Sequence, residues 1–516
     1  MKNIIFTFIL SCVFITACSY EKNNEKNNEN LKPNIVLIYF DDLGYGDVGA
    51  YGSKAIKTPN IDNLANNGIR FTKGYSSSST CTPSRYALLT GTYPWRNKNA
   101  HILPGSAPLI ISTNELTIPK MLKQQGYHTG IVGKWHLGLG TGNVDWNKRI
   151  SPGPNEVGFK YSFIMAATQD RVPTVFIENG QVVRLEPDDP IKVSYTHKFP
   201  EEITGREHPE LLKMMYSHGH DGTIINGISR IGHMKGGKNA LWIDENLADT
   251  FVVRAQQYIK AHKDEPFFLY FALQQPHVPR TPHPRFVGKT ELGPRGDVIV
   301  EGDWCVGEIM NTLKEQGLLE NTLIILSSDN GPVLDDGYKD EAAQKNGKHK
   351  PWGPFRGGKY SLFEAGTRVP FITYWKDHIK PGISDAMVSQ IDILNTLASL
   401  TGSNLMSKDG INLKDVFLGK STKGRDTMIF EATGKTGYRK GDWVMIPPYK
   451  GPAVNKLVNI ELGNSNKYQL YNIKDDPGQH TDLSQKYPDL LEEMKKEFAT
   501  VRGVNADKDV KQLELE

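Results

Sequence analysis

The sequence predicts an α/β protein with a large sheet flanked by helices, followed by a smaller α+β part. Three observations support this prediction. Apolar runs of strand length alternate with amphipathic stretches of helix length through roughly the first three quarters of the chain. Polar residues that could carry chemistry follow directly after several of these runs, as at the carboxyl ends of strands in open sheets. Beyond Gly402 the alternation gives way to short strand-like pieces and one last amphipathic stretch.

Apolar runs and helical spacing define the predicted elements. Buried strands are predicted at residues 34–40, 128–132, 267–273 and 322–326. Helices are predicted at 61–66, 116–125, 249–262, 300–313 and 391–400, the last ended by Gly402. In the final part, strands are predicted at 427–431, 443–446 and 468–472, and a helix at 488–501. Strands that alternate with helices favour a sheet covered on both faces.

The first residues are predicted to direct export. A short basic region precedes an apolar run, residues 4–15, that is too short to span a bilayer comfortably. The run ends in Ile15-Thr16-Ala17-Cys18, which resembles the lipobox of bacterial lipoproteins and would make Cys18 the lipidated first residue. We therefore expect a lipoprotein signal peptide over 1–17, a polar tether over 18–31, and a lipid anchor in the periplasm or at the cell surface. An ordinary cleavable signal peptide is the alternative, and it also exports the chain.

Length and charge narrow the class of protein. A chain of 516 residues predicts more than one hydrophobic core. The formal net charge of +3 is too small to favour nucleic acid as a partner.

The run Cys81-Thr82-Pro83-Ser84-Arg85 is the most informative part of the sequence. Pro83 suits the first turn of a helix, where its missing N–H costs nothing. Cys81 would then lie just before a helix N-terminus, where backbone N–H groups favour an anion and a thiol has a lowered pKa. The alternative is a free cysteine packed beneath a helix.

Four oxygen-bearing side chains follow two of the predicted strands. Asp41 and Asp42 come directly after the first strand, and Asp329 and Asn330 come after the strand at 322–326. Three carboxylates and an amide suit a hard divalent cation such as Ca²⁺ or Mg²⁺. Taken alone, Asp41-Asp42 could instead cap a helix, and Asp329-Asn330-Gly331 could form a turn. Two acidic strand ends in one α/β pattern favour the metal site.

These motifs together resemble the type I sulfatases, which depend on formylglycine. The same family order continues through Gly133-Lys134-Trp135-His136-Leu137-Gly138, His277 and Arg356-Gly357-Gly358-Lys359. The resemblance covers most of the chain and is to arylsulfatase-like bacterial carbohydrate sulfatases. It implies an alkaline-phosphatase-like sandwich with a large mixed sheet between helices, and a smaller C-terminal α+β domain with an antiparallel sheet. We expect the catalytic domain over 32–405 and the C-terminal subdomain over 406–516.

The resemblance also implies a nucleophile and a metal. Cys81 would be oxidised by a formylglycine-generating or radical maturation enzyme to formylglycine, whose aldehyde hydrate is the nucleophile. Asp41, Asp42, Asp329, Asn330 and an oxygen of the modified Cys81 would bind Ca²⁺, with Mg²⁺ less favoured.

Further roles follow from the resemblance for the basic residues and the histidines. Lys134, Lys359 and Arg85 would supply positive charge toward the sulfate. His277 would protonate the leaving sugar alcohol, and His136 would help to release sulfate from the enzyme.

The cysteines then leave no pair for a disulfide. Cys12 would be lost with the signal peptide, Cys18 lipidated and Cys81 modified, so that only Cys305 remains. Cys305 lies in the predicted helix at 300–313, and we expect it in the core.

Four residues between the two histidine motifs are candidates for substrate recognition: Asp170, Arg171, His220 and Arg230. They could bond sugar hydroxyls or carboxylates, or equally stabilise loops. The predicted activity is removal of sulfate from a sulfated carbohydrate, with galactose and N-acetylgalactosamine sulfates as candidates.

Two other functions stay open. One is a phosphonate or phosphate ester hydrolase of the same superfamily. The other is a surface glycan-binding protein that is catalytically silent because Cys81 is never converted. A single metal set with two lysines favours the monoanionic sulfate ester.

Overall fold

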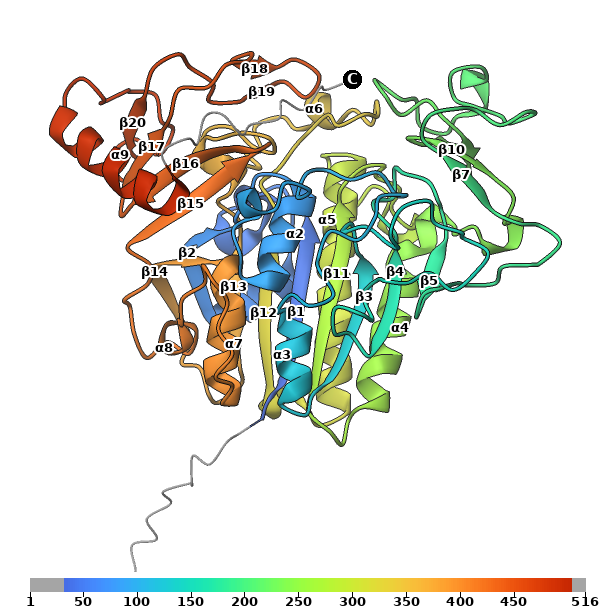
Figure 1. Cartoon of the computed structure of the whole chain (residues 1–516), viewed down its shortest axis with the longest axis horizontal. Helices are drawn as coiled ribbons and strands as arrows, with labels where there is room; N and C mark the ends of the chain where they lie inside the picture. The colour runs from blue at the N-terminus through green and yellow to red at the C-terminus, as the bar shows by residue number, and fades with distance from the viewer. Residues whose placement is uncertain (1–31, 504–516) are drawn as a thin grey trace, which may run out of the picture. The chain divides into compact units, whose positions relative to one another are not determined.

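A computed structural model describes residues 32–503, so the predicted signal peptide, tether and Cys18 lie outside the described residues. Its main feature is a ten-stranded sheet (Figure 1). The strands run in the order β14 (Gly382–Ser389), β2 (Ile69–Tyr75), β13 (Phe371–Tyr374), β12 (Thr322–Ser328), β1 (Asn34–Asp41), β11 (Phe267–Pro276), β3 (His128–Lys134), β4 (Tyr161–Met165), β5 (Phe176–Glu178) and β6 (Gln181–Val182). The four strands predicted from apolar runs are β1, β3, β11 and β12, and they lie together at the centre.

The sheet is mixed, as predicted. From β12 through β1, β11 and β3 to β4, neighbouring strands are parallel, whereas β13 is antiparallel to both of its neighbours. β5 and β6 add an antiparallel edge. All eight residues of β1 are buried, because helices cover both faces of the sheet.

Alternate residues of β1 face two separate cores. Ile35, Leu37 and Tyr39 belong to a core that includes residues of α2 (Cys81–Thr90), α3 (Ile118–Gln124) and α7 (Ile393–Thr401). The intervening Val36, Ile38 and Phe40 pack with α1 (Pro59–Asn67), α4 (Leu247–Ala261) and α5 (Pro294–Glu315). In Figure 1, α2, α3 and α7 lie in front of the sheet. The period-two alternation of strand side chains thus produces the predicted sandwich.

The C-terminal part is a small antiparallel sheet with a helix on it, as predicted. The sheet contains β15 (Thr427–Ala432), β16 (Lys435–Lys440), β17 (Trp443–Ile446) and β20 (Gln469–Asn472). Met494 and Phe498 of α9 (Pro488–Arg502) pack against Ile429, Tyr438 and Met445 of this sheet. The boundary at residue 405 stays a prediction.

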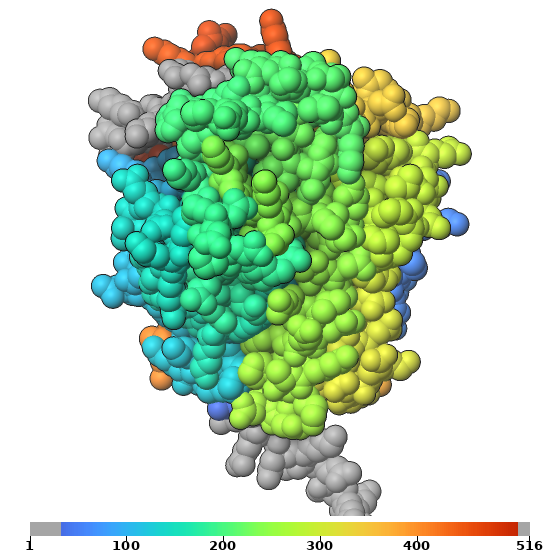
Figure 2. Space-filling view, turned by 90° about the vertical axis from the view of Figure 1, so that its right-hand side faces the viewer, coloured from blue at the N-terminus to red at the C-terminus, as the bar shows by residue number. Residues whose placement is uncertain are grey.

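Short elements fill the connections above the carboxyl ends of the strands. The pairs are β7 (Lys192–Ser194) with β10 (His233–Lys235), β8 (Ile224–Ile225) with β9 (Ile228–Ser229), and β18 (Val454–Asn455) with β19 (Ile460–Glu461), and the short helix is α6 (Ala342–Lys345). A second short helix, α8 (Lys414–Phe417), lies lower in Figure 1, beside α7 and β14. Figure 2 shows the green segment that contains β7 and β10 lying across the upper end of the face formed lower down by α4. Within residues 32–503, no helix is both long and apolar enough to cross a membrane.

Glu431 joins the C-terminal sheet to the loop that precedes α2. Its backbone N–H donates to the Ser77 carbonyl, and its carbonyl accepts from the Ser79 N–H. Burial raises the pKa of the Glu431 carboxyl from 4.5 to about 8, although the Gly434 N–H and Arg502 oppose this shift. The Glu431 carboxyl is therefore protonated in the native state over a pH range in which it is ionised in the unfolded chain.

We predict that the protein loses stability as the pH rises from about 4.5 to about 8, because over this range only the native state keeps the proton on Glu431. Across that window the free energy of unfolding should fall by about 1.4 kcal/mol per pH unit from this one group. Glu431→Gln should remove that part of the slope, so that the gap between variant and wild type widens as the pH rises. Thermal melts from pH 5 to 8 measure it, with Glu492→Gln, an exposed carboxylate of α9, as the control. Parallel curves for wild type and Glu431→Gln would contradict a protonated Glu431.

Candidate active site

The carboxyl ends of the central strands bring the predicted residues together. Asp41 is the last residue of β1, and Asp42 follows it with a positive φ of 66°. Lys134 ends β3. His277 follows β11, and Asp329 and Asn330 follow β12. Because these strands are parallel neighbours, their ends meet at one edge of the sheet.

The four predicted metal ligands form one buried cluster. The Asp42 backbone N–H donates to Asp329 Oδ1 at 3.1 Å, and Asn330 Nδ2 donates to Asp42 Oδ1 at 2.6 Å. Asp41 Oδ1 and Asn330 Oδ1 are buried without a hydrogen-bond partner. Unpartnered buried oxygens beside three carboxylates are the donor set that a hard divalent cation takes, so these residues fit the metal that the resemblance implies.

Electrostatics in this cluster agree with a cation site. Burial, and then repulsion by Asp329, raises the pKa of Asp41 well above its usual range. Burial also raises the Asp42 pKa, with Lys359 opposing it. For Asp329, burial acts in the same direction, but Arg85 and Lys134 together hold its pKa below the usual value.

Three cations surround the carboxylates. Lys134 Nζ lies 2.5 Å from Asp41 Oδ2, and Lys359 Nζ lies 2.9 Å from Asp42 Oδ2. Arg85 donates through Nε to Asp329 Oδ2 at 3.0 Å, and its Nη2 lies 2.8 Å from the same oxygen. Arg85 has no exposed side-chain surface, and two of its nitrogens contact Asp329, which it therefore orients.

Cys81 is the first residue of α2, so the helix begins one residue earlier than the sequence predicts, and Pro83 lies in the first turn as expected. Its thiol is free and buried. The expectation of a lowered thiol pKa is wrong. Burial raises the pKa of Cys81, and the attraction of Lys134 and Lys359 does not overcome it. The unmodified thiol is therefore poorly suited to attack, although it lies within reach of the charges of this cluster.

The two histidines present different nitrogens to the site. His136 has a positive φ of 56°, and its Nε2 pairs with the Leu103 carbonyl at 2.9 Å, while Nδ1 is buried without a partner. His277 pairs through Nδ1 with the Val278 carbonyl at 2.7 Å, and its Nε2 lies 4.0 Å from Asp42 Oδ2. Because each carbonyl accepts a hydrogen bond, the nitrogen bonded to it carries a proton and the other is the acceptor in a neutral ring.

Burial lowers the pKa of both histidines well below the usual range. For His136 the next contribution is repulsion by Lys134, and for His277 it is repulsion by Lys359 and Lys134. Without an anion in the site, both rings are therefore neutral at pH 7.

Three of the four predicted substrate residues form a second cluster beside the first. Arg171 Nη1 lies 2.9 Å from Asp170 Oδ1, and His220 Nε2 lies 3.0 Å from Asp170 Oδ2. Burial alone would raise the Asp170 pKa, but Arg171 and the hydrogen bond from His220 hold it well below its usual range. Asp170 also contributes to the electrostatics of His277, which links the two clusters.

Arg230 does not join this group. Its guanidinium is fully buried, pairs with Asp244 Oδ2 at 2.6 Å and donates to the carbonyls of Gln169 and Ile225. The predicted sugar contact is therefore corrected to a supporting role, in which Arg230 holds the loop that carries Asp170.

Two functional candidates escaped the sequence analysis. Asp336 Oδ2 accepts from Lys359 Nζ at 2.8 Å, and the Tyr360 hydroxyl donates to Asp336 Oδ1 at 3.1 Å. The available signals were the acidic pair Asp335-Asp336 shortly after Gly331 and the position of Tyr360 next to Lys359.

Comparisons with known proteins identify the family. The family described as Sulfatase matches residues 33–403. An N-acetylgalactosamine-6-O-sulfatase of Bacteroides thetaiotaomicron is 47% identical over 97% of this chain and 100% of its own length. Human arylsulfatase A is 31% identical over 87% of this chain and 83% of its own length.

Solved structures of other proteins are also similar to this chain over most of its length. One from work on glycosaminoglycan metabolism by Bacteroides thetaiotaomicron has a TM-score of 0.90 at 48% identity, covering 92% of this chain and 99% of that chain. Another, Ps i-CgsB in complex with k-i-k-neocarrahexaose, has a TM-score of 0.64 at 26% identity, covering 93% and 94%. The chain therefore belongs to the sulfatase family. It is a sulfuric ester hydrolase with the alkaline-phosphatase-like fold, as the sequence predicts.

Proposed function

We propose that this enzyme removes the 6-O-sulfate from N-acetylgalactosamine, or from galactose, in a sulfated glycan. The main support for sulfate ester hydrolysis at this site is the position of Cys81 among Lys134, Lys359 and the carboxylate cluster. The similarity to an N-acetylgalactosamine-6-O-sulfatase over nearly the whole chain supports the sugar.

The proposed nucleophile is formylglycine made from Cys81, because the raised thiol pKa argues against attack by sulfur. One hydroxyl of its hydrate attacks the sulfur of the sulfate ester, the bond between sulfur and the sugar oxygen breaks, and the sugar alcohol leaves with a proton. The second hydroxyl then loses its proton, the C=O bond forms again, and the bond from that carbon to the sulfate oxygen breaks, so that sulfate leaves and the aldehyde returns. A Ca²⁺ ion held by Asp41, Asp42, Asp329 and Asn330 supplies positive charge for the reacting oxygens, with Mg²⁺ as the less favoured occupant. Lys134 and Lys359, ion-paired here with Asp41 and Asp42, bind the sulfate oxygens.

The hydrogen bonds of the histidines support different roles. The unpartnered Nδ1 of His136 is an acceptor that can take a proton from a hydroxyl at residue 81. Nε2 of His277 faces Asp42 and can hold a proton for the leaving alcohol. Lys359 and Lys134 lower the His277 pKa, so an anionic sulfate bound between them would offset their charge and favour the protonated ring.

Exchanging the leaving group should separate the two histidines. His277→Ala should lower kcat/KM for a sugar sulfate by about a hundredfold or more, and for an activated aryl sulfate by about tenfold or less, because a phenolate needs no proton. His136→Ala should slow turnover of both substrates by a similar factor, because sulfate release is common to both.

Steady-state kinetics on both substrates measures this difference, provided that the wild type accepts both. His101→Ala, an exposed histidine, serves as the control. Equal losses on the two substrates for His277→Ala would refute its role as the acid.

Sugar recognition is assigned to Asp170, Arg171 and His220, which form one hydrogen-bonded group next to His277. A panel of sulfated monosaccharides and oligosaccharides, with desulfated products identified by NMR, tests the function. We expect 6-sulfated N-acetylgalactosamine to be the best substrate. Release of phosphate from phosphate or phosphonate esters, without release of sulfate from any sugar, would overturn the proposal.

The proposed location is a membrane, through a lipid on Cys18 after removal of residues 1–17. The lipobox-like run Ile15-Thr16-Ala17-Cys18 supports it. Release from membranes by detergent but not by salt checks the anchor. Recovery of the wild type in the soluble periplasm would instead favour an ordinary signal peptide.

A further inference from the structure

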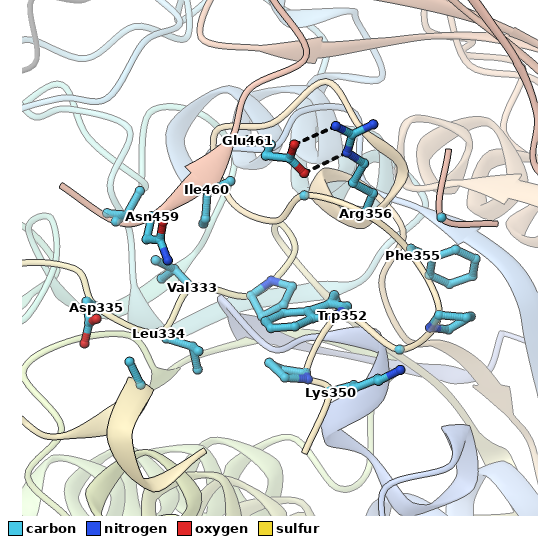
Figure 3. A pocket seen from close by; sticks show the side chains of 18 of the residues that line it. Val333, Leu334, Asp335, Lys350, Trp352, Phe355, Arg356, Asn459, Ile460 and Glu461 are labelled. Carbon is cyan, nitrogen blue, oxygen red and sulfur yellow. Dashed lines mark hydrogen bonds and ion pairs between the residues drawn. The ribbon is translucent and has the colours of Figure 1, made fainter. Parts of the chain in front are cut away.

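Two neighbouring hollows lie outside the candidate active site, and no residue assigned to catalysis or metal binding lines either. The first has a volume of about 410 Å³ and lies between loops 332–335, 350–357 and 458–461 (Figure 3). The second has a volume of about 700 Å³ and is lined by loops 51–55 and 345–350. They share Lys350, Gly353 and Pro354, so they adjoin each other, and we call the two hollows together the lysine groove.

The second hollow concentrates positive charge. Its lining includes Lys54, Lys345, Lys348 and Lys350 but only one carboxylate, Glu291. Lys345 pairs with Glu341 outside the hollow at 2.7 Å. The other three lysines are exposed and have no ion pair among residues 32–503. On a chain whose formal net charge is only +3, this is a local excess of positive charge that attracts a polyanion.

The loop that carries these lysines is held in place from beneath. His349 Nε2 lies 2.8 Å from Asp47 Oδ1, and Arg295 Nη2 lies 2.7 Å from Asp47 Oδ2. The Gly46 N–H donates to the Pro351 carbonyl at 2.8 Å. Lys348 and Lys350 are therefore presented by a fixed backbone, which lowers the entropy lost when they bind a ligand.

The first hollow offers an aromatic surface beside charged side chains, among them Lys350 and Asp335. Figure 3 shows the Trp352 side chain in its middle, with Lys350 on one side and the Arg356–Glu461 pair on the other. Arg356 and Glu461 neutralise each other through contacts of 2.7 and 2.6 Å. A half-buried indole between polar groups suits the apolar face of a sugar ring.

The groove begins at loops that belong to the candidate active site. Gly357 lines the first hollow and lies two residues before Lys359. The Lys359 N–H donates to the carbonyl of Pro332, another lining residue, at 3.0 Å. A chain bound in the groove would thus lie against the backbone that positions Lys359.

We propose that the lysine groove binds a strand of sulfated glycan outside the catalytic centre, with sulfates on Lys54, Lys348 and Lys350 and a sugar ring on Trp352. This inference rests on the proposed function, since a sulfated glycan is the substrate named there. Holding the polymer at a second place would raise its local concentration at the active site.

The test uses the triple variant Lys54→Ala, Lys348→Ala, Lys350→Ala. Its matched control replaces Lys408, Lys420 and Lys423, three exposed lysines that also have no ion pair among residues 32–503. The probes are a 6-sulfated galactosaminoglycan polymer, its desulfated form, and N-acetylgalactosamine 6-sulfate. The groove variant should show a KM for the polymer raised on the order of tenfold, with kcat/KM for the monosaccharide unchanged.

Binding measured without turnover separates this inference from the proposed function. In a Cys81→Ala background, affinity electrophoresis in a gel containing the polymer should retard the chain, and the groove substitutions or added salt should reduce that retardation. Trp352→Ala should weaken retardation without changing its salt dependence. Equal retardation of groove and control variants would overturn the proposal, as would binding of the desulfated polymer, anionic vesicles or RNA as tightly as the sulfated one. Absence of turnover on every sulfated sugar, with retardation intact, would fail the proposed function alone.

Discussion

Cys81→Ala is expected to abolish turnover, with a loss of at least about a thousandfold, because alanine can form neither a thiolate nor an aldehyde hydrate. The fold should survive, since the change is one sulfur atom at the first residue of α2. The matched control is Cys305→Ala, which also empties a fully buried cysteine site but lies in α5. It should keep activity and lose about 1 kcal/mol of stability.

Peptide mass spectrometry of active wild type tests the same hypothesis chemically. The peptide that contains Cys81 should carry an aldehyde or its hydrate, whereas Cys305 should be an unmodified thiol. Full activity in a preparation whose Cys81 is entirely thiol would sink the formylglycine mechanism.

Asp329→Ala is expected to lose nearly all activity and the response to metal. Asp329 accepts from the Asp42 N–H and from Arg85, so its removal loses a ligand and leaves the buried Arg85 charge with only a longer contact, of 3.9 Å, to Asp41. Activity should fall by at least about a thousandfold, and added Ca²⁺ should no longer raise the melting temperature.

The readout is a thermal melt in chelator and in excess Ca²⁺ or Mg²⁺, which does not depend on activity. Wild type should melt higher with Ca²⁺. Asp303→Asn provides the control: Asp303 is a buried carboxylate that accepts from the N–H groups of Asn60 and Ile61 at the start of α1. That variant should be less stable but keep the Ca²⁺ response. A wild type with no bound metal and no change in melting on chelation would contradict the site.

The central strands could be predicted from the sequence because a strand that is buried on both faces has an unbroken run of apolar residues. Residues 34–40 became β1, Asn34–Asp41, and residues 267–273 became β11, which runs on to Pro276. The strands β2 and β14 are not among the predicted elements. Their burial is partial: β2 alternates only over its first four residues, before Lys73 and Gly74, and β14 contains Gly382 and Asp385 in its exposed half, so neither contains a long apolar run or a sustained alternation.

Site residues that stand at strand ends or within a motif could be predicted from the sequence. Residues whose role depends on a contact with a side chain far away in the sequence could not. Asp336 and Tyr360 gain significance only because the fold brings them to Lys359. The Cys81 pKa was predicted in the wrong direction because helix position is visible in the sequence and depth of burial is not. For Arg230 the sequence predicted a sugar contact, because the spacing of residues does not show that its side chain pairs with the buried Asp244.

The position of β1 at the middle of the sheet also bears on how this chain folds. Ile35 pairs with Phe268 on one side and Leu323 on the other, and the Phe267 N–H bonds to Asn34 across 233 residues of sequence. β1 is the first strand of residues 32–503, and it cannot pair with either neighbour until most of the chain has been synthesised. Such long-range parallel pairing makes folding slow and leaves a largely apolar strand open to intermolecular pairing meanwhile. We expect expression yield of this protein to depend more on chaperones and growth temperature than its final stability would suggest.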